Sequence, residues 1–411
     1  MELPGPVVIV GAGLAGATTA ATLRERGFTG DIVLFDAQSH QPYELPPLSK
    51  AILLGEKDQP DWVRDAGFYA GHDIDFRPSA TIRELRLADH VVVDGAGAEQ
   101  PFDRLVLATG LRPRTLPVTD AQLKGVHTLR TLDDSLALRA RLTPGTRVVV
   151  VGGGWIGCEV AAAARTHGSQ VTVVEPLRLP LVRALGRPVA EVFHDLHAAH
   201  GVHWKLGVGV QGLVGENGVL RSVRLDDGTN LPADVVVEAI GATPRVELAE
   251  RAGLVLADRP VGGVAVNAAL RASQPGVYAV GDIAAHDHPR YGRRVRTEHW
   301  ANARNQGEHV AGNLLTGDQP YRRSPYFFTD QYDLGMEYRG LADPEQDELV
   351  VRGDLAAREF IAFWLRDGRV RAAMNVNSWD DGDALQSLVD NDAPVEASAL
   401  KGTAKLADLV G

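Results

Sequence analysis

The sequence contains little sulfur: one cysteine, Cys158, and three methionines among 411 residues. A lone cysteine excludes a disulfide framework within the chain and a CxxC redox pair. The scarcity of thiols favours a cytoplasmic location. Because Cys158 falls inside a predicted helix, where a small apolar side chain usually packs, we expect it to have no catalytic role.

Long apolar runs and an excess of basic residues are also missing. No stretch reaches the roughly 18 apolar residues that a membrane-spanning helix needs. The uncharged stretch from Leu3 to Leu23 follows Glu2 instead of a basic segment and carries a glycine motif, so it does not fit a signal peptide. The net charge of −11 disfavours binding to nucleic acid. We therefore expect neither a membrane nor a nucleic acid as partner.

Glycine and alternating strand and helix patterns are abundant. The 44 glycines and the 45% hydrophobic content allow two or three domains with cores of their own. Apolar runs at 6–10 and 31–36 flank one helical pattern at 17–26, and runs at 147–151 and 170–175 flank another at 158–167. Two such βαβ units predict an α/β fold with two doubly wound, Rossmann-like dinucleotide-binding domains. After about Pro325, short strand patterns and helical patterning predict a smaller α+β domain, with a hairpin turn at Asp367-Gly368.

The first glycine motif, Gly11-Ala-Gly13-Leu-Ala-Gly16, follows a predicted strand and opens a helix. In this context the first glycine makes the turn, the second admits the pyrophosphate, and the third lets helix and strand pack closely. The helix N-terminus then faces a negative phosphate. Asp36 ends the next strand, where a carboxylate can accept a hydrogen bond from a ribose hydroxyl.

The second motif, Gly152-Gly-Gly154-Trp-Ile-Gly157, repeats this arrangement with Glu175 as its acidic partner. A carboxylate at that position favours the free 2′-hydroxyl of NADH and repels the 2′-phosphate of NADPH. Arg178 and Arg183 lie close enough in the sequence to keep NADPH open as an alternative.

With both motifs in view, nearly the whole chain resembles the FAD-dependent ferredoxin reductases that serve cytochrome P450 monooxygenases and Rieske-type dioxygenases, the putidaredoxin reductase and biphenyl-dioxygenase ferredoxin reductase type. The most specific strings are Pro46-Pro-Leu-Ser-Lys50 and Glu298-His-Trp-Ala-Asn302. The other supporting strings are Ala108-Thr-Gly110, Arg130-Thr-Leu-Asp-Asp134, Gly152-Gly-Gly-Trp-Ile-Gly-Cys-Glu159, Val277-Tyr-Ala-Val-Gly-Asp282 and Phe328-Thr-Asp-Gln331. Many members carry Arg in place of Leu45 and Trp in place of Phe328.

The resemblance implies a glutathione-reductase-like chain order in which the FAD domain is interrupted by the NAD domain. The expected segments are 1–113 for the first part of the FAD domain, 114–246 for the NAD domain, 247–324 for the second part of the FAD domain, and 325–411 for the C-terminal domain. Gly281-Asp282, which follows a predicted strand, supports the return to the FAD domain.

The resemblance also assigns site residues. Lys50 would stabilise the negative charge of reduced flavin, and Glu159 would pair with Lys50 and help to place the nicotinamide. Read alone, Lys50 fits a solvated surface lysine, and a glutamate in the first turn of a helix is favourable to the helix dipole. Trp300 would lie against the flavin, although an ordinary core aromatic fits the same pattern.

The complete expected sets are as follows. FAD would contact Gly11, Gly13, Leu14, Ala15, Gly16, Asp36, Ala37, Lys50, Ile82, Ala108, Thr109, Gly110, Arg130, Gly281, Asp282 and Trp300. NADH would contact Gly152, Gly154, Trp155, Ile156, Gly157, Glu159, Glu175, Arg183 and Gly241.

Four histidines, His194, His197, His200 and His203, recur every third residue. Three successive steps of three residues turn a helix through about 900°, so the first and last histidines lie on opposite faces. Gly201 also ends the predicted helix before His203. We expect no metal site.

These features predict an NADH-dependent oxidoreductase that transfers a hydride from NADH to FAD and then single electrons to a small [2Fe-2S] ferredoxin. Such ferredoxins are usually acidic, so their docking site should be basic. A cluster of arginines just before and within the Glu298 segment is the candidate: Arg290, Arg293, Arg294, Arg296 and Arg304. A solvated loop explains the same cluster equally well.

Two other functions share this fold. One is an NADH oxidoreductase whose acceptor is a quinone, oxygen or monodehydroascorbate. The other is a redox-dependent interaction flavoprotein similar to apoptosis-inducing factor. The arginine cluster favours the ferredoxin partner. We expect a monomer or a weak homodimer.

Overall fold

The computed structural model describes residues 5–118 and 123–410. The chain forms two compact units, each assembled from three separate segments. The first unit comprises Met1–Glu44, Asp61–Arg112 and Thr243–Pro325, and the second comprises Leu45–Pro60, Pro113–Ala242 and Tyr326–Gly411. The chain passes from one unit to the other within two short strands, β8 (Leu111–Pro113) and β17 (Ala242–Pro244).

The first unit is built on a parallel sheet with the strand order β19-β7-β1-β2-β3. Strand β1 has the sequence Val-Val-Ile-Val, and all four side chains are buried, as expected for the centre of a sheet covered on both faces. The strands are β1 (Val7–Val10), β2 (Ile32–Phe35), β3 (Ile74–Arg77), β7 (Arg104–Leu107) and β19 (Val277–Ala279).

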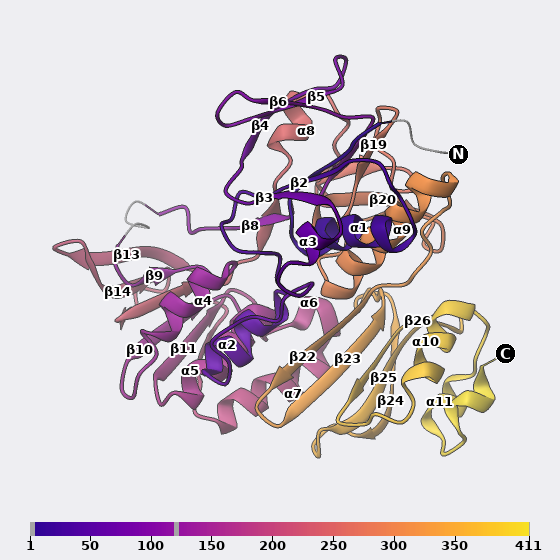
Figure 1. The fold of residues 1–411 in the computed structure, drawn as a ribbon. Coiled ribbons are helices and arrows are strands. Elements are labelled where there is room, and N and C mark those ends of the chain that lie inside the picture. Colours follow the sequence, from indigo (N-terminus) through magenta and orange to yellow (C-terminus); the bar gives the residue numbers. More distant parts are fainter. Residues whose placement is uncertain (1–4, 119–122, 411) are drawn as a thin grey trace. The chain divides into compact units, whose positions relative to one another are not determined.

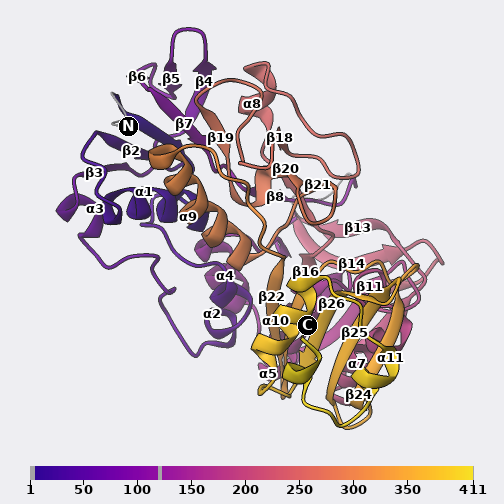
Figure 2. The ribbon, with the colours of Figure 1, turned by 90° about the vertical axis from the view of Figure 1, so that its right-hand side faces the viewer.

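Helices α1 (Leu14–Glu25) and α9 (Trp300–Thr316) pack side by side in this unit (Figures 1 and 2). Close approach is possible because Gly307 has no side chain: a Cβ there would lie 2.5 Å from the carbonyl oxygen of Ala15. The Oγ1 of Thr19 also donates to the carbonyl oxygen of Gly307 at 3.3 Å. A segment from late in the chain is thereby joined to the first helix.

The other elements of the first unit form two small sheets and short helices. They are α3 (Phe68–Gly71), β4 (Ile82–Arg86), β5 (Val91–Asp94), β6 (Glu99–Pro101), α8 (Glu247–Arg251), β18 (Val264–Val266), η2 (Gly281–Ile283), β20 (Ala284–His288) and β21 (Arg293–Val295).

The second unit contains a parallel sheet of its own, with the order β12-β11-β10-β16-β9. Its strands are β9 (Val126–His127), β10 (Arg147–Val151), β11 (Gln170–Glu175), β12 (His203–Leu206) and β16 (Val235–Glu238). Its helices are η1 (Pro46–Ser49), α2 (Ala51–Leu54), α4 (Leu132–Arg139), α5 (Trp155–Thr166), α6 (Val182–Leu185) and α7 (Arg187–Ala199). The unit also contains a small antiparallel sheet, which consists of β13 (Val210–Glu216), β14 (Val219–Leu225) and β15 (Asn230–Pro232).

An antiparallel sheet from the C-terminal segment completes the second unit, in the order β22-β23-β26-β25-β24. One face, which includes Trp364, packs against α6 and α7, and the opposite face, which includes Phe363, packs against α10 and α11. The elements are β22 (Tyr326–Gln331), β23 (Leu334–Gly340), β24 (Glu348–Asp354), β25 (Glu359–Arg366), β26 (Arg369–Val376), α10 (Gly382–Asn391), α11 (Ala397–Lys401) and η3 (Leu406–Leu409).

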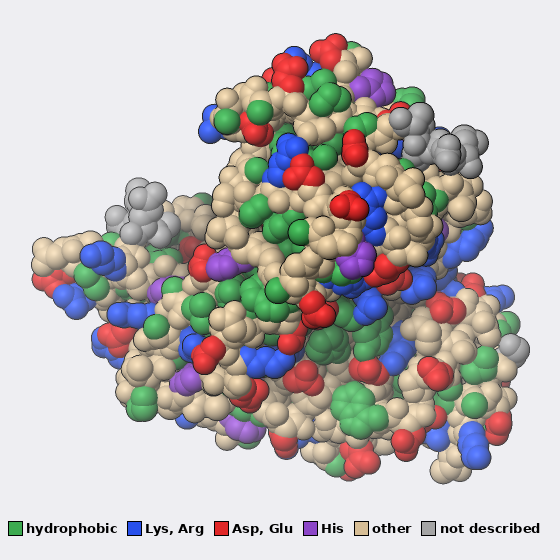
Figure 3. All heavy atoms as spheres, in the orientation of Figure 1, with side chains coloured by type: hydrophobic (Ala, Val, Ile, Leu, Met, Phe, Trp, Pro, Cys, Tyr) green, Lys and Arg blue, Asp and Glu red, His purple; other side chains and the backbone are tan. Residues whose placement is uncertain are grey.

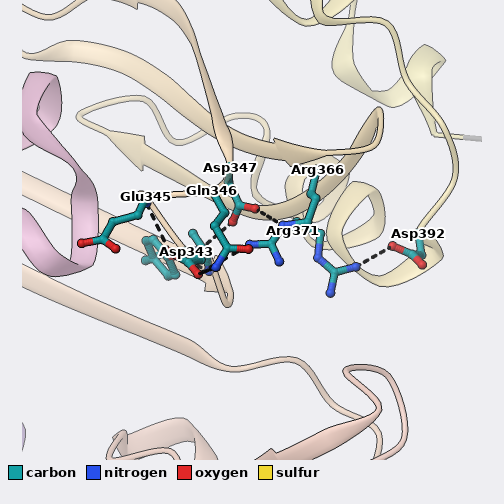
Figure 4. A network of polar contacts seen from close by, with 9 residues as sticks. Asp343, Glu345, Gln346, Asp347, Arg366, Arg371 and Asp392 are labelled. Atoms are coloured by element: carbon teal, nitrogen blue, oxygen red, sulfur yellow. Dashed lines mark hydrogen bonds and ion pairs between the residues drawn. The ribbon is translucent and has the colours of Figure 1, made fainter.

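Ion pairs fix the connection between β23 and β24 (Figure 4). The side chain of Asp347 is only 1% exposed and accepts hydrogen bonds from the backbone N–H of Asp343 and from Nε of Arg366, both at 2.6 Å. Arg371 and Asp392 form a further pair at 3.5 Å, which ties β26 to the end of α10. Elsewhere, acidic and basic side chains are interspersed over the visible face of each unit (Figure 3).

The predicted α/β fold with two doubly wound regions and a C-terminal α+β region is confirmed. The first helix of each βαβ unit begins three residues earlier than predicted, at Leu14 and Trp155, because Gly13 and Gly154 serve as the N-caps. None of the helices within the described residues has the length and apolar character needed to cross a membrane.

Candidate active site

Four expected FAD-binding segments follow four neighbouring strands of the first unit. Gly11–Gly16 follows β1, Asp36 and Ala37 follow β2, Ala108–Gly110 follows β7, and Gly281-Asp282 follows β19. Because these strands are parallel and adjacent, all four segments lie at the carboxyl edge of one sheet. This edge is where doubly wound sheets bind their ligands.

The three glycines of the first motif have three different surroundings. Gly11 has a φ of +104°, which requires glycine, and a Cβ on Gly16 would lie 2.0 Å from the carbonyl oxygen of Gly11. Within the described part of the chain, a Cβ on Gly13 would meet no atom within 4 Å. No side chain caps the start of α1. The loop therefore fits a pyrophosphate: it is tight where helix and strand meet, and open where the ligand's phosphates would lie.

Asp36 follows β2 directly, and its Oδ1 accepts a hydrogen bond from the backbone N–H of Gln38 at 3.2 Å. Burial raises the pKa of this carboxyl group, and the backbone N–H groups of Gln38 and Ala37 partly oppose the rise. Ala37 is exposed. Ile82 begins β4 in a separate small sheet and is 5% exposed within the core of the unit.

Buried donors lie at the start of α9. Gln306 uses its Oε1 to accept the backbone N–H of Gly281 at 2.8 Å, which leaves its buried Nε2 without a hydrogen-bond partner among the described residues. The buried indole Nε1 of Trp300 has none there either. Buried N–H groups are normally satisfied, so these two donors fit the acceptor atoms of a bound flavin. The carbonyl oxygen of Asp282 accepts a hydrogen bond from Arg296 at 3.0 Å.

The NAD motif in the second unit has the same design. Gly152 has a φ of +104°, a Cβ on Gly157 would lie 2.0 Å from the carbonyl oxygen of Gly152, and a Cβ on Gly154 would meet nothing within 4 Å. Glu175 ends β11, and Gly241, with a φ of +92°, follows β16. Since β11, β10 and β16 are adjacent, these residues also lie at one sheet edge.

Glu175 holds this motif in shape. One carboxylate oxygen accepts the backbone N–H of Gly153 at 2.7 Å, and the other accepts that of Leu177 at 2.9 Å. Each carboxylate oxygen can accept a second hydrogen bond, so a ribose hydroxyl can still be bound. Arg183 is exposed on α6.

The two residues after Gly154 point to different surroundings. The ring of Trp155 packs against Phe327 and Phe193, with centroids 4.9 and 5.7 Å away. Ile156 is 44% exposed, unusual for an isoleucine at a helix start. Trp155 is therefore held by aromatic contacts and stays partly exposed, while Ile156 is exposed.

Lys50 and Glu159 form an ion pair within the second unit, with 2.8 Å between Nζ and Oε1. The side chain of Glu159 is 4% exposed and that of Lys50 is 16% exposed. Lys50 is placed between η1 and α2, and the hydroxyl of Ser135 on α4 donates to the carbonyl oxygen of Leu48 at 2.6 Å. Glu159 is the fifth residue of α5, so the expected position in the first turn is wrong. Interaction with the helix terminus is therefore not the reason for a glutamate here, because that effect fades beyond the first turn.

Two hydroxyl groups complete the surroundings of Glu159, and neither was expected from the sequence. Ser49 donates to Oε2 and Thr329 of β22 donates to Oε1. Both lie in strings that carried the family resemblance, next to Lys50 and Phe328, but nothing in the spacing indicated that their hydroxyl groups meet one carboxylate. The Nζ of Lys50 also lies 5.4 Å from the ring centroid of Phe328.

Asp330 is a second acidic group near this pair. Burial raises the pKa of the Asp330 carboxyl group, the charge of Lys50 lowers it, and that of Glu159 raises it. The charge of Lys50 therefore acts on two carboxyl groups, the buried Glu159 and the exposed Asp330. Arg130, the remaining expected FAD contact, precedes α4 in this unit, and its backbone N–H donates to Asp134 at 3.0 Å.

The expected arginine cluster is less positive than its sequence indicates. Arg294 pairs with Asp287 at 3.0 Å, Arg296 with Glu298 at 2.6 Å, and Arg304 with Glu308 at 3.2 Å. Arg296 is also only 11% exposed and donates to the carbonyl oxygen of Val261. These contacts hold the Arg296 side chain against the backbone of its own unit. Arg293 is exposed, and Arg290 is partly buried against Tyr291.

Cys158 and two histidines of the series make packing contacts. Cys158 is fully buried, and burial first, then the charges of Glu159 and Glu175, raise the pKa of its thiol far above the usual range. His194 stacks on Trp204 and His200 stacks on Tyr332, with centroids 5.6 and 3.7 Å apart.

Comparison with known proteins agrees with this geometry. The pyridine nucleotide-disulphide oxidoreductase family matches residues 5–307, and the reductase C-terminal family matches residues 326–409. The anthranilate 1,2-dioxygenase system ferredoxin–NAD(+) reductase component of Burkholderia cepacia is 40% identical over 98% of this chain and 97% of its own length. A crystal structure of the ferredoxin reductase for the CYP199A2 system from Rhodopseudomonas palustris is 34% identical, with a TM-score of 0.94 over 99% of this chain and 100% of its own. The covalent putidaredoxin reductase–putidaredoxin complex is 35% identical, with a TM-score of 0.91 over 97% and 96%.

Two dinucleotide cradles and a C-terminal domain thus define a nucleotide-dependent flavoprotein reductase. The chain belongs to the pyridine nucleotide-disulphide oxidoreductase family and, within it, to the ferredoxin reductases. It is an FAD-dependent oxidoreductase that uses a nicotinamide dinucleotide, as the sequence predicted. The disulphide in the family name does not apply to this chain, because Cys158 is its only cysteine.

Proposed function

We propose that this protein is an NADH-dependent ferredoxin reductase that supplies electrons to a [2Fe-2S] ferredoxin serving a cytochrome P450 or a Rieske-type oxygenase. The observation that carries the proposal is the pair of glycine cradles, each open only at its middle glycine, Gly13 or Gly154. When bound, FAD supplies the conversion from two-electron to one-electron chemistry that a ferredoxin requires. The protein contributes binding, orientation and charge.

Lys50 and Glu159 are the residues to which we assign the hydride step. The ammonium of Lys50 compensates negative charge, and Glu159 fixes the direction of that ammonium. Glu159→Gln keeps the size of the side chain but removes its charge, so we expect slower anaerobic reduction by NADH in stopped-flow measurements. An unchanged rate together with an unchanged NADH affinity would remove Glu159 from the mechanism.

Glu175 supports NADH over NADPH. Its carboxylate is at the end of β11, where the adenosine ribose binds in doubly wound domains. A 2′-phosphate would place two negative charges together. We expect the kcat/KM for NADH to exceed that for NADPH by more than about tenfold, which corresponds to about 1.4 kcal/mol. Equal values would contradict this assignment.

We retain the arginine cluster as the proposed ferredoxin-docking surface, with Arg293, Arg294 and Arg304 as the residues to test. Arg296 is excluded from the test because its contacts with Val261 and Asp282 hold the backbone. We expect the triple Arg→Gln variant to raise the KM for ferredoxin and to weaken its dependence on ionic strength. A matched control is the same change at Arg187, Arg221 and Arg224 in the second unit. Equal behaviour of the two triple variants would remove the docking proposal.

A quinone, oxygen or monodehydroascorbate reductase and an interaction flavoprotein remain the alternatives. Turnover that is fast with quinone and unaffected by any ferredoxin would favour the first. Slow turnover with all acceptors, together with dimerisation on addition of NADH, would favour the second. We propose a cytoplasmic protein that is a monomer or a weak homodimer, which size-exclusion chromatography with and without NADH tests.

A further inference from the structure

Strand β22 presents alternate residues to two different surroundings. Phe327, Thr329 and Gln331 contact residues of α5 and α7, whereas Phe328, on the other side of the strand, lies beside Lys50. This alternation follows from the two-residue period of a strand. The C-terminal sheet therefore reaches both members of the Lys50–Glu159 pair.

Thr329 contacts the glutamate directly. The residue is 1% exposed, and its hydroxyl donates to Oε1 of Glu159, the same oxygen that Lys50 contacts at 2.8 Å. Ser49 donates to the other oxygen. Three donors from two segments thus surround one buried carboxylate, and Thr329 is the one that the C-terminal domain supplies.

A chain of hydrogen bonds sets the direction of the Thr329 hydroxyl. The Oε1 of Gln331 lies 2.8 Å from Nε2 of His197, and the Nε2 of Gln331 lies 3.2 Å from the Oγ1 of Thr329. An amide oxygen can only accept, so His197 carries its proton on Nε2 and Gln331 offers its amide N–H to Thr329. The lone pair of Oγ1 on that side is occupied, and the hydroxyl proton is directed to Glu159.

We propose that Thr329 is a positioning residue for the hydride step: it fixes the carboxylate of Glu159, and through it the ammonium of Lys50. The inference rests on the proposed function of that pair in NADH oxidation. It extends the active site to β22, so that the C-terminal domain contributes a side chain to the reductive chemistry in addition to its packing.

The test replaces Thr329 with valine, which has nearly the same shape but no hydroxyl group. Glu159 loses one of its three hydrogen-bond donors in this variant, so we expect reduction by NADH to slow by about tenfold or more. Thr329→Ser restores a hydroxyl and should return the rate to near the wild-type value. Thr166→Val is the matched control, because Thr166 lies on the same helix as Glu159 and donates only to the carbonyl oxygen of Ala162.

A second readout does not depend on turnover. The oxidised holoenzyme is treated with limiting acetic anhydride, and acetylation of Lys50 is measured by mass spectrometry relative to the exposed Lys401. An amine released from its ion pair reacts faster, so we expect several-fold more acetylation of Lys50 in Thr329→Val, and wild-type levels in Thr329→Ser and Thr166→Val. Wild-type acetylation of Lys50 in Thr329→Val would overturn the proposal.

A double-mutant cycle separates this inference from the function on which it rests. In a Glu159→Gln background, Thr329→Val should cause little further slowing, because the residue through which it acts is already changed. If Thr329→Val slowed reduction as much in the Glu159→Gln background as in the wild type, Thr329 would act through a residue other than Glu159. That result would overturn the proposal. If Glu159→Gln alone leaves the rate unchanged while Thr329→Val still increases the acetylation of Lys50, the positioning stands and the assigned function of the pair fails.

Discussion

At the scale of single residues, the glycines within each of the two motifs have different roles, some in folding and one in binding. A Cβ on the middle glycines, Gly13 and Gly154, would contact no atom of the described residues, while a Cβ on the last glycines, Gly16 and Gly157, would lie 2.0 Å from a carbonyl oxygen. The first and last glycines are therefore required by the protein itself, the first by its positive φ and the last by this close contact. The middle glycine is explained by a ligand.

This difference predicts opposite phenotypes for two alanine variants of the NAD motif. Gly157→Ala should lower the free energy of unfolding by about 2 kcal/mol or more, because backbone atoms must shift. Gly154→Ala should unfold close to the wild-type temperature but bind NAD+ at least about tenfold more weakly, a difference of about 1.4 kcal/mol. Thermal unfolding and titration calorimetry measure both. A Gly154→Ala variant with wild-type affinity would contradict the cradle.

His197 adds a pH dependence at the same scale. It is fully buried, and burial lowers its pKa from 6.5 to about 4, with smaller lowering by His200 and His194 and an opposing hydrogen bond to Gln331. Because the folded-state pKa lies below the unfolded value, protonation favours the unfolded chain. The stabilisation is complete above about pH 6.5 and is lost as the pH falls from 6.5 toward 4.

We therefore expect the stability advantage of the wild type over His197→Gln to shrink as the pH is lowered. Between pH 6.5 and 5 the decrease should be about 1.6 kcal/mol. Urea unfolding of both proteins at several pH values checks this. A constant difference across that range would mean that His197 does not titrate with a depressed pKa.

At the scale of elements, the C-terminal sheet is covered on both faces, by α6 and α7 on one and by α10 and α11 on the other. Trp364 is 1% exposed in the first of these layers, and Trp379 is 55% exposed in the segment after β26. Trp364→Ala should cost about 3–5 kcal/mol of stability, whereas Trp379→Ala should cost less than about 1 kcal/mol. Similar losses in chemical denaturation would contradict the burial of Trp364.

The elements also show what the sequence could predict. The strands at Arg147–Val151 and Gln170–Glu175 were predicted to the residue, because continuous Val-rich runs are typical of buried parallel strands. The two-residue turn at Asp367-Gly368, with φ of 52° and 67°, was predicted from its Asp-Gly pair. The predicted helix starts lie three residues too far toward the C-terminus, because the side-chain pattern alone does not locate a glycine N-cap.

The candidate site was only partly predictable. The glycines and acidic residues follow strands directly, so sequence order places them at a sheet edge. Ser49 and Thr329 are distant in sequence from Glu159, and only tertiary packing brings them together. The same limit applies to Arg294, Arg296 and Arg304, whose acidic partners neutralise a cluster that looks strongly basic in the sequence.

At the scale of the whole molecule, the central claim is a direction of electron flow from NADH to a ferredoxin. The chain provides two cradles of the same design, and family membership assigns them to FAD and a nicotinamide dinucleotide. In our proposal, Lys50 and Glu159 support the hydride step. The exposed Arg293 forms part of the docking surface.

The most direct test is steady-state reduction of cytochrome c by NADH, with the purified protein and a panel of [2Fe-2S] ferredoxins. We predict a slow rate without ferredoxin and a rate that rises steeply, and saturably, with one member of the panel. A rate that no ferredoxin changes, while a quinone or oxygen sustains fast NADH oxidation, would contradict the assignment.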